Sequence, residues 1–319
     1  MIIVQDSKHI KRRSGTPTDR VQVKAPEVLC LYRLEFHDET LAFLDEIDTL
    51  VFNRLVYVEV DFSDVVHITA AAALVLFAKI TRCQSCLPFG VFRFPDRIIS
   101  IVPPNSKEVK AKFVQTGLWS AIKPGGQKKL ERLWSDWSNP YKTGNDPSSQ
   151  FEDVIGHLRQ GFGTLPKRIV GAIQESYLNI AHHAYELFKQ DPGFNEFMLG
   201  RWWQYASINK NTGKMAIIIY DMGAGIPETM RSIQRGVSDC SSIQHAMKPG
   251  VTRFNLQGRG KGFSDIKRPI DSNASAEYLL VYSGKGEVVY KSGQILKEYA
   301  HTNSIGGTLL EWAFTGEGR

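Results

Sequence analysis

An apolar strand that runs directly into a carboxylate and two glycines is the feature that most restricts the fold of this chain. Residues 215–220 form a continuous apolar run rich in isoleucine, which is typical of a buried strand. Asp221, Gly223 and Gly225 follow it without a break. A carboxylate at the end of a buried strand can accept a hydrogen bond from a bound base, and glycines let backbone approach a ligand closely. This pattern predicts a ligand site at the edge of a sheet.

A helix with a polar stripe is predicted upstream of this strand, over residues 166–189. Proline suits its first turn, where the missing N–H costs nothing. Its core-facing positions are Ile169, Ile173, Ser176, Ile180, Ala184 and Leu187. Glu175, Asn179 and His183 recur every four residues and form a second stripe, about 100° round the helix. A carboxylate, an amide and an imidazole are therefore expected at the edge of the buried face.

A glycine-rich turn, Gly258-Arg259-Gly260-Lys261-Gly262, precedes a helix-compatible run over residues 264–267. The N–H groups and positive dipole at a helix N-terminus suit a phosphate, and Lys261 or Arg259 can add charge. The spacing is neither that of a P-loop nor that of a dinucleotide-binding fingerprint. Residues 305–312 are predicted to form a closing strand. Taken singly, these features also fit a solvated stripe or a simple turn, but their order and combination are far more specific.

This combination resembles the ATP-binding domain of the GHKL superfamily, which includes DNA gyrase and the histidine kinases. The matching boxes are Glu175 and Asn179 extended through His183, then Asp221, Gly223 and Gly225, then Gly258, Gly260 and Gly262, and finally Gly307 and Thr308. The resemblance covers about residues 151–314 and is nearest to the anti-sigma-factor kinases, because residues 179–185 are similar to their Asn-x-x-x-His-x-Tyr motif. It implies a Bergerat-type α/β sandwich that binds ATP with Mg²⁺.

The resemblance also implies a role for each matching residue. Asn179 would hold Mg²⁺ through its side-chain oxygen, and the metal would bridge the phosphates. Glu175 would polarise the attacking water or hydroxyl. Asp221, supported by Thr308, would accept from the adenine amino group. Residues 227–257 would form a mobile lid. The candidate phosphate contacts of this region are Lys248, Arg253 and Arg259.

The first half of the chain resembles a STAS domain, the fold of anti-sigma-factor antagonists. Strands are predicted over residues 56–62 and 87–94, an alanine-rich helix over 68–80, and a second helix over 109–122 that Gly117 breaks. The family's acceptor serine has no counterpart, because Thr69-Ala70-Ala71-Ala72 stands in its place. Thr69 could substitute as acceptor, but a helix N-cap is its more common role. This half is therefore interpreted as a docking or scaffolding module.

The resulting α/β organisation has four parts. They are a flexible basic segment at residues 1–27, the STAS-like domain at 28–122, a linker at 123–150 and the ATP-binding domain at 151–319. The linker is placed by its Pro, Gly, Asn and Ser content. The longest apolar run, residues 68–78, is about half the ~20 residues that a membrane-spanning helix needs. Four cysteines and the absence of a leader pattern favour a cytoplasmic protein without a membrane partner.

Three functions remain open at this stage. The first is a slow Mg-ATPase that acts as a conformational or interaction switch. The second is a serine/threonine kinase of the anti-sigma-factor type that acts on a separate protein, and the third is an ATP sensor without turnover. A protein partner or a homodimer is expected through the STAS-like domain. Nucleic acid is a weaker expectation: the net charge of +6 permits it, but the chain has no room for the transducer domain of the DNA-acting relatives.

Overall fold

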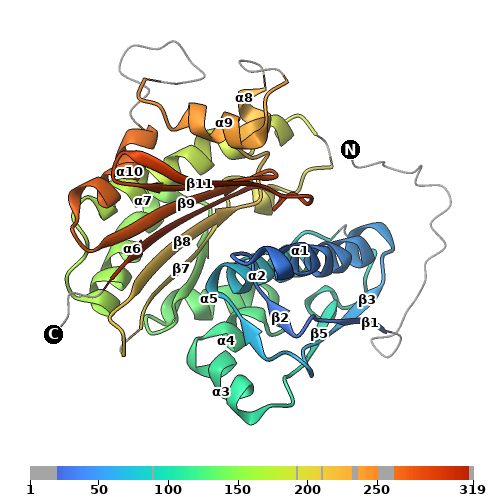
Figure 1. The fold of residues 1–319 in the computed structure, drawn as a ribbon. Coiled ribbons are helices and arrows are strands. Elements are labelled where there is room, and N and C mark those ends of the chain that lie inside the picture. The colour runs from blue at the N-terminus through green and yellow to red at the C-terminus, as the bar shows by residue number, and fades with distance from the viewer. Residues whose placement is uncertain are drawn as a thin grey trace.

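The computed structural model describes residues 20–87, 90–191, 193–209, 211–231, 236–250 and 262–315. It has a mixed α/β architecture with one antiparallel sheet of seven strands and two smaller parallel sheets, as Figure 1 shows. Within the part of the chain that is described, every helix is too short or too polar to cross a lipid bilayer.

The N-terminal half is built on a three-stranded parallel sheet in the order β1-β3-β5. Its strands are β1 (Arg20–Lys24), β3 (Tyr57–Asp61) and β5 (Ile99–Val102), and β2 (Val28–Leu29) pairs separately with β4 (His67–Ile68). The helices are α1 (Leu34–Asp48) with a π-helical end at Thr49–Asn53, α2 (Ala70–Ser85), a 3-10 turn at Pro95–Arg97, α3 (Lys107–Gln115), α4 (Leu118–Ile122) and α5 (Gly126–Ser135).

The C-terminal half is built on the antiparallel sheet, in the order β11-β10-β9-β12-β8-β7-β6. Its strands are β6 (Tyr141–Gly144), β7 (Trp202–Ile208), β8 (Met215–Asp221), β9 (Ala276–Ser283), β10 (Gly286–Lys291), β11 (Gln294–Ala300) and β12 (Thr308–Phe314). The helices are α6 (Pro147–Phe162), α7 (Ile169–Asn179), α8 (Ile226–Met230), α9 (Asp239–Ala246) and α10 (Gly262–Ser272), with short turns of helix at Ile180–Ala184, Glu186–Phe188 and Glu196–Met198.

Opposite faces of the seven-stranded sheet contact different parts of the chain. On β12, the indole N–H of Trp312 donates to the Ile266 carbonyl of α10. The preceding residue, Glu311, accepts from the Tyr32 hydroxyl of the N-terminal half at 2.6 Å. Because successive side chains of a strand point to opposite faces, α10 covers one face and the N-terminal half covers the other, as in Figure 1.

Helix α2 lies in the centre of the molecule. Its alanine-rich sequence is apolar around most of its circumference, and such a helix is stable only when it is buried on all sides. It packs against β5 of the parallel sheet and against β7 and β8 of the antiparallel sheet. The helix that the sequence predicts over residues 68–80 is therefore confirmed and extends to Ser85.

Two segments differ from the expected organisation. Residues 20–24, within the segment expected to be flexible, form β1 because their backbone pairs with β3, and Val23 is only 2% exposed. Residues 126–144, within the expected linker, form α5 and β6, and β6 is the edge strand of the seven-stranded sheet. The buried Lys142 ammonium joins these two elements, since it donates to backbone carbonyls at the end of α5, including that of Asp136 at 2.6 Å.

Two further elements begin or end away from the expected positions. The strand expected over residues 87–94 lies instead at Ile99–Val102, after a 3-10 turn that starts at Pro95. The α-helix expected over 166–189 begins at Ile169 and ends at Asn179, where a π-helical turn takes over. The break at Gly117 is confirmed, since this glycine has a φ of +77° between α3 and α4.

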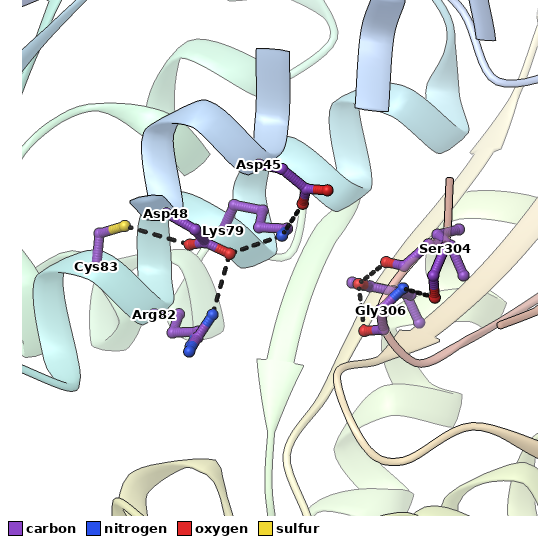
Figure 2. A network of polar contacts seen from close by, with 9 residues as sticks. Asp45, Asp48, Lys79, Arg82, Cys83, Ser304 and Gly306 are labelled. Atoms are coloured by element: carbon purple, nitrogen blue, oxygen red, sulfur yellow. Dashed lines mark hydrogen bonds and ion pairs between the residues drawn. The ribbon is translucent and has the colours of Figure 1, made fainter. Parts of the chain in front are cut away.

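An ionic network around the buried Lys79 side chain joins α1 to α2 (Figure 2). The Lys79 ammonium is 2.8 Å from Asp45 and 2.6 Å from Asp48, and Asp48 also pairs with Arg82 at 3.0 Å. Burial lowers the pKa of Lys79, but the two aspartates outweigh that effect and raise it above its ordinary value. The Lys79 side chain is thus held charged inside the protein.

Replacing Lys79 by methionine is expected to lower the free energy of unfolding by about 2 kcal/mol, because Asp48 loses one of its two cations while remaining mostly buried. Methionine retains most of the apolar stem, so packing changes little. Urea unfolding of the variant measures the effect. The control is Arg82→Met, whose side chain is 28% exposed and is expected to cost less. Equal stability of Lys79→Met and the unsubstituted protein would contradict the prediction.

Candidate functional site

Asp221 is the last residue of β8 and points to the sheet face that α7 covers. Its neighbour across β7 is Trp202, whose ring stacks on Tyr177 of α7 with centroids 4.3 Å apart. The carboxylate accepts the N–H of Gly223 at 2.8 Å and also the N–H of Thr308. Burial raises the pKa of Asp221 to about 7, although these two N–H groups lower it. Among the described residues no cation pairs with this carboxylate, so it fits a ligand with hydrogen-bond donors.

The turn after Asp221 docks on the end of the polar helix. The N–H of Ala224 donates to the carbonyl of Ala184 at 2.8 Å, and the N–H of Met222 donates to the Tyr185 hydroxyl at 3.1 Å. Gly223 makes this contact possible, because a Cβ at position 223 would lie 2.3 Å from the Ala184 carbonyl oxygen. The structure therefore brings the segment that follows Asn179 against the segment that follows Asp221.

Substituting alanine for Gly223 is expected to lower the free energy of unfolding by about 2 kcal/mol, because backbone must move to relieve the clash with Ala184. The hydrogen bond from Ala224 would be strained by the same movement. Gly171→Ala on α7 is the matched control, since a Cβ there meets open space and alanine favours a helix. Thermal unfolding of both variants checks the prediction, which is wrong if Gly223→Ala is as stable as Gly171→Ala.

Thr308 lies directly beside Asp221, and Ser283 lies beside Thr308 on the next strand. The two hydroxyl oxygens are 2.9 Å apart, and the Ser283 hydroxyl also accepts the N–H of Ile226 at 2.8 Å. Asp221, Thr308 and Ser283 thus form a polar row across three strands. Gly225 lies at the end of this row, because its φ of +82° turns the chain toward Ser283.

Glu175 and Asn179 of α7 lie close to Gly262. A Cβ at position 262 would lie 3.2 Å from Glu175 Oε2 and 3.7 Å from Asn179 Oδ1. Gly262 is the first residue of α10, which packs along α7. Burial, with the negative charge of Asp265 beside it, raises the pKa of Glu175. The missing side chain of Gly262 leaves the carboxylate and the amide close to a helix N-terminus.

The remaining expected site residues fall into two groups. His183 and Lys248 are described: His183 lies in the π-helical turn after Asn179, so the α-helical spacing that placed it on the stripe does not hold, and Lys248 is exposed just beyond α9. Part of the expected lid is a packed helix, because α9 contacts β10 and β11 and Ile243 is fully buried. The other group lies outside the described residues and comprises Arg253, Gly258, Arg259, Gly260 and Lys261.

The sequence alone did not single out Ser283 or the role of Tyr185. Tyr185 belongs to the expected motif over residues 179–185, but its bond to the Met222 N–H depends on a segment almost forty positions away. Ser283 belongs to no motif, and its place beside Thr308 is set by the pairing of β9 with β12. Only strand pairing could have revealed it.

The side chains of Asn179 and Glu175 offer hard oxygen donors. An amide oxygen and a carboxylate are ligand types that suit Mg²⁺ better than a softer transition metal. Among the described residues, there is no group of three or more His, Cys, Asp or Glu side chains placed to hold a metal ion.

No protein-family model matches this sequence, and a search of curated proteins finds no match either.

Proposed function

We propose that this chain is a regulatory protein that binds Mg-ATP in a GHKL-type site and hydrolyses it slowly to drive a switch. The observation that carries the proposal is the docking of the Asp221–Gly225 turn on the helix that bears Asn179, through the Gly223–Ala184 contact. It supports a single site with a buried acceptor at one end and a cation-binding amide at the other. An adenine amino group suits the acceptor, and Mg-bound phosphates suit the amide.

In the proposed mechanism, Asp221 binds and orients the base, and Thr308 supports it from the neighbouring strand. Asn179 would hold Mg²⁺, which would offset the negative charge of the phosphates. Glu175 would take a proton from the attacking water, and its raised pKa makes it a stronger base than an ordinary carboxylate. Because Glu175 and Asn179 both adjoin the N-terminus of α10, the helix dipole would also favour the phosphates.

We further propose that the N-terminal half is a STAS-like docking module rather than a phosphate acceptor for this site. Helix α2, which Thr69 precedes as the N-cap residue, packs on the sheet face opposite to the one that α7 covers. The Thr69 hydroxyl contacts the carbonyl of Leu29 at 3.4 Å. Any transfer to a serine or threonine would therefore need an acceptor on a separate protein, and the kinase alternative rests on finding one.

Calorimetric titration with a non-hydrolysable ATP analogue tests the proposed site directly. We expect saturable binding with one nucleotide per chain, tighter with Mg²⁺ than with EDTA, and much weaker binding of the GTP analogue.

Phosphate release then separates a slow ATPase from an ATP sensor. Labelled ATP incubated with a cell lysate detects transfer to a partner. Absence of saturable binding in the titration would refute the proposal.

A further inference from the structure

Tyr220 ties β8 to the turn that leads into Thr308. It precedes Asp221, so its side chain points to the opposite face of the sheet, where it is fully buried against the N-terminal half. Its hydroxyl donates to the carbonyl oxygens of Ile305 at 2.9 Å and Gly306 at 3.0 Å. One phenolic proton is thus shared between two consecutive backbone acceptors of the same turn.

The turn held by Tyr220 has high intrinsic backbone flexibility. Gly306 and Gly307 have φ values of +73° and +137°, and glycine in such conformations leaves the unbound backbone many alternatives. The turn must still be placed accurately, because a Cβ at position 307 would lie 1.9 Å from the Asp221 carbonyl oxygen. Other bonds also hold the turn, including Ile305 N–H to the Gly284 carbonyl at 2.9 Å. From the face opposite to the site, Tyr220 holds the turn itself, and the Tyr282 hydroxyl donates to the Asn303 carbonyl just before it at 3.3 Å.

Charged groups of α1 and α2 act electrostatically on the Tyr220 phenol. Burial raises its pKa well above the ordinary value, Asp221, Asp48 and Asp45 raise it further, and Arg82 lowers it. The last three of these residues belong to the Lys79 network of α1 and α2, and Figure 2 shows that network in one view with Ser304 and Gly306 of the turn. The phenol therefore remains protonated and is available as a donor. Helix α2 of the N-terminal half packs against β8, the strand that bears Tyr220.

We propose that Tyr220 is a positioning residue for adenine recognition, through which the N-terminal half holds Thr308 in register with Asp221. This inference rests on the proposed nucleotide site and deepens it, because it assigns part of the base specificity to a residue that does not touch the nucleotide. It also gives the N-terminal half a role beyond docking.

The test compares Tyr220→Phe with Tyr205→Phe by competition calorimetry with ATP and GTP analogues. Tyr205 points to the same face of the sheet, because its ring packs on Tyr141, which packs in turn on Phe77 of α2. Its hydroxyl bonds to Ser207 instead of the turn. We expect Tyr220→Phe to bind ATP about tenfold more weakly with GTP nearly unchanged, so that the ATP-to-GTP preference falls about tenfold. Tyr205→Phe should keep the full preference. An unchanged preference in Tyr220→Phe, or an equal fall in both variants, would overturn the proposal.

Two further measurements separate this inference from the proposed function. Hydrogen exchange on the nucleotide-free protein should show faster exchange at the amides of residues 305–308 in Tyr220→Phe only, and unchanged exchange would overturn the positioning role. Lys79→Met should lower the ATP-to-GTP preference about threefold. An unchanged preference would show that the N-terminal half does not contribute to base recognition. If the unsubstituted protein bound neither nucleotide, the proposed function itself would fall, and the recognition role of Tyr220 with it.

Discussion

Asp221→Asn is expected to weaken ATP binding about 1,000-fold while making the protein more stable. The side-chain oxygen of asparagine would still accept the N–H of Gly223, which leaves its NH₂ group facing the amino group of the base. The asparagine NH₂ and the amino group of the base would then face each other in a buried position with no acceptor between them. A binding site that recognises a ligand through a specific hydrogen bond discriminates strongly against such a mismatch. Calorimetry with the ATP analogue measures the loss.

The gain in stability follows from the burial of the carboxylate. The pKa of Asp221 is about 7 in the folded protein against an ordinary 3.8, so the folded state binds the proton more tightly than the unfolded state. Stability is therefore lost as the pH rises from about 4 to about 7, and this loss approaches about 4 kcal/mol above pH 7. Asparagine does not ionise, so the variant avoids this loss of stability. Its buried, unpaired NH₂ group lowers the free energy of unfolding by about 2 kcal/mol. The expected net gain at pH 8 is about 2 kcal/mol.

A matched control for this variant is Asp271→Asn. Asp271 is an exposed carboxylate of the same half that accepts from the Tyr290 hydroxyl and lies outside the proposed site. Its replacement should leave nucleotide affinity unchanged. If Asp221→Asn bound ATP as tightly as the unsubstituted protein, this carboxylate would not recognise the base.

Glu175→Gln is expected to slow phosphate release about 100-fold and to leave ATP affinity within about threefold. Glutamine keeps the size of the side chain beside Gly262 but cannot accept a proton from water. Affinity is preserved because, in the proposed site, the base contact comes from Asp221 and the cation contact from Asn179. Phosphate release under saturating Mg-ATP, with calorimetry at the same pH, measures both quantities.

The control is Gln174→Ala, an exposed neighbour on the same helix. It should leave both turnover and affinity unchanged. Equal phosphate release from Glu175→Gln and the unsubstituted protein would remove Glu175 from catalysis. It would favour the ATP sensor without turnover, provided that the titration still shows binding.

Local patterns were sufficient for the elements whose residues contact the core along their whole length. The continuous apolar run at residues 215–220 forms β8, the alanine-rich run forms α2, and Gly117 separates α3 from α4. Glu175 and Asn179 lie on one α-helix as their spacing indicates. In each case the deciding signal lies within one or two turns of helix or one strand, where apolar periodicity and glycine act directly on the backbone.

Strand pairing and distant contacts decided the rest. β1 and β6 are short and partly polar, and each is ordered by backbone bonds to a strand far along the chain. The π-helical turn after Asn179 ends in the docking contact with Gly223, which no periodicity encodes. The amino-acid sequence by itself determined which side chains supply the carboxylate, amide and hydroxyl groups of the candidate site. Only the tertiary structure decided that Ser283 stands beside Thr308 and that Tyr220 holds the turn before it, because those contacts arise when segments far apart in sequence share one sheet.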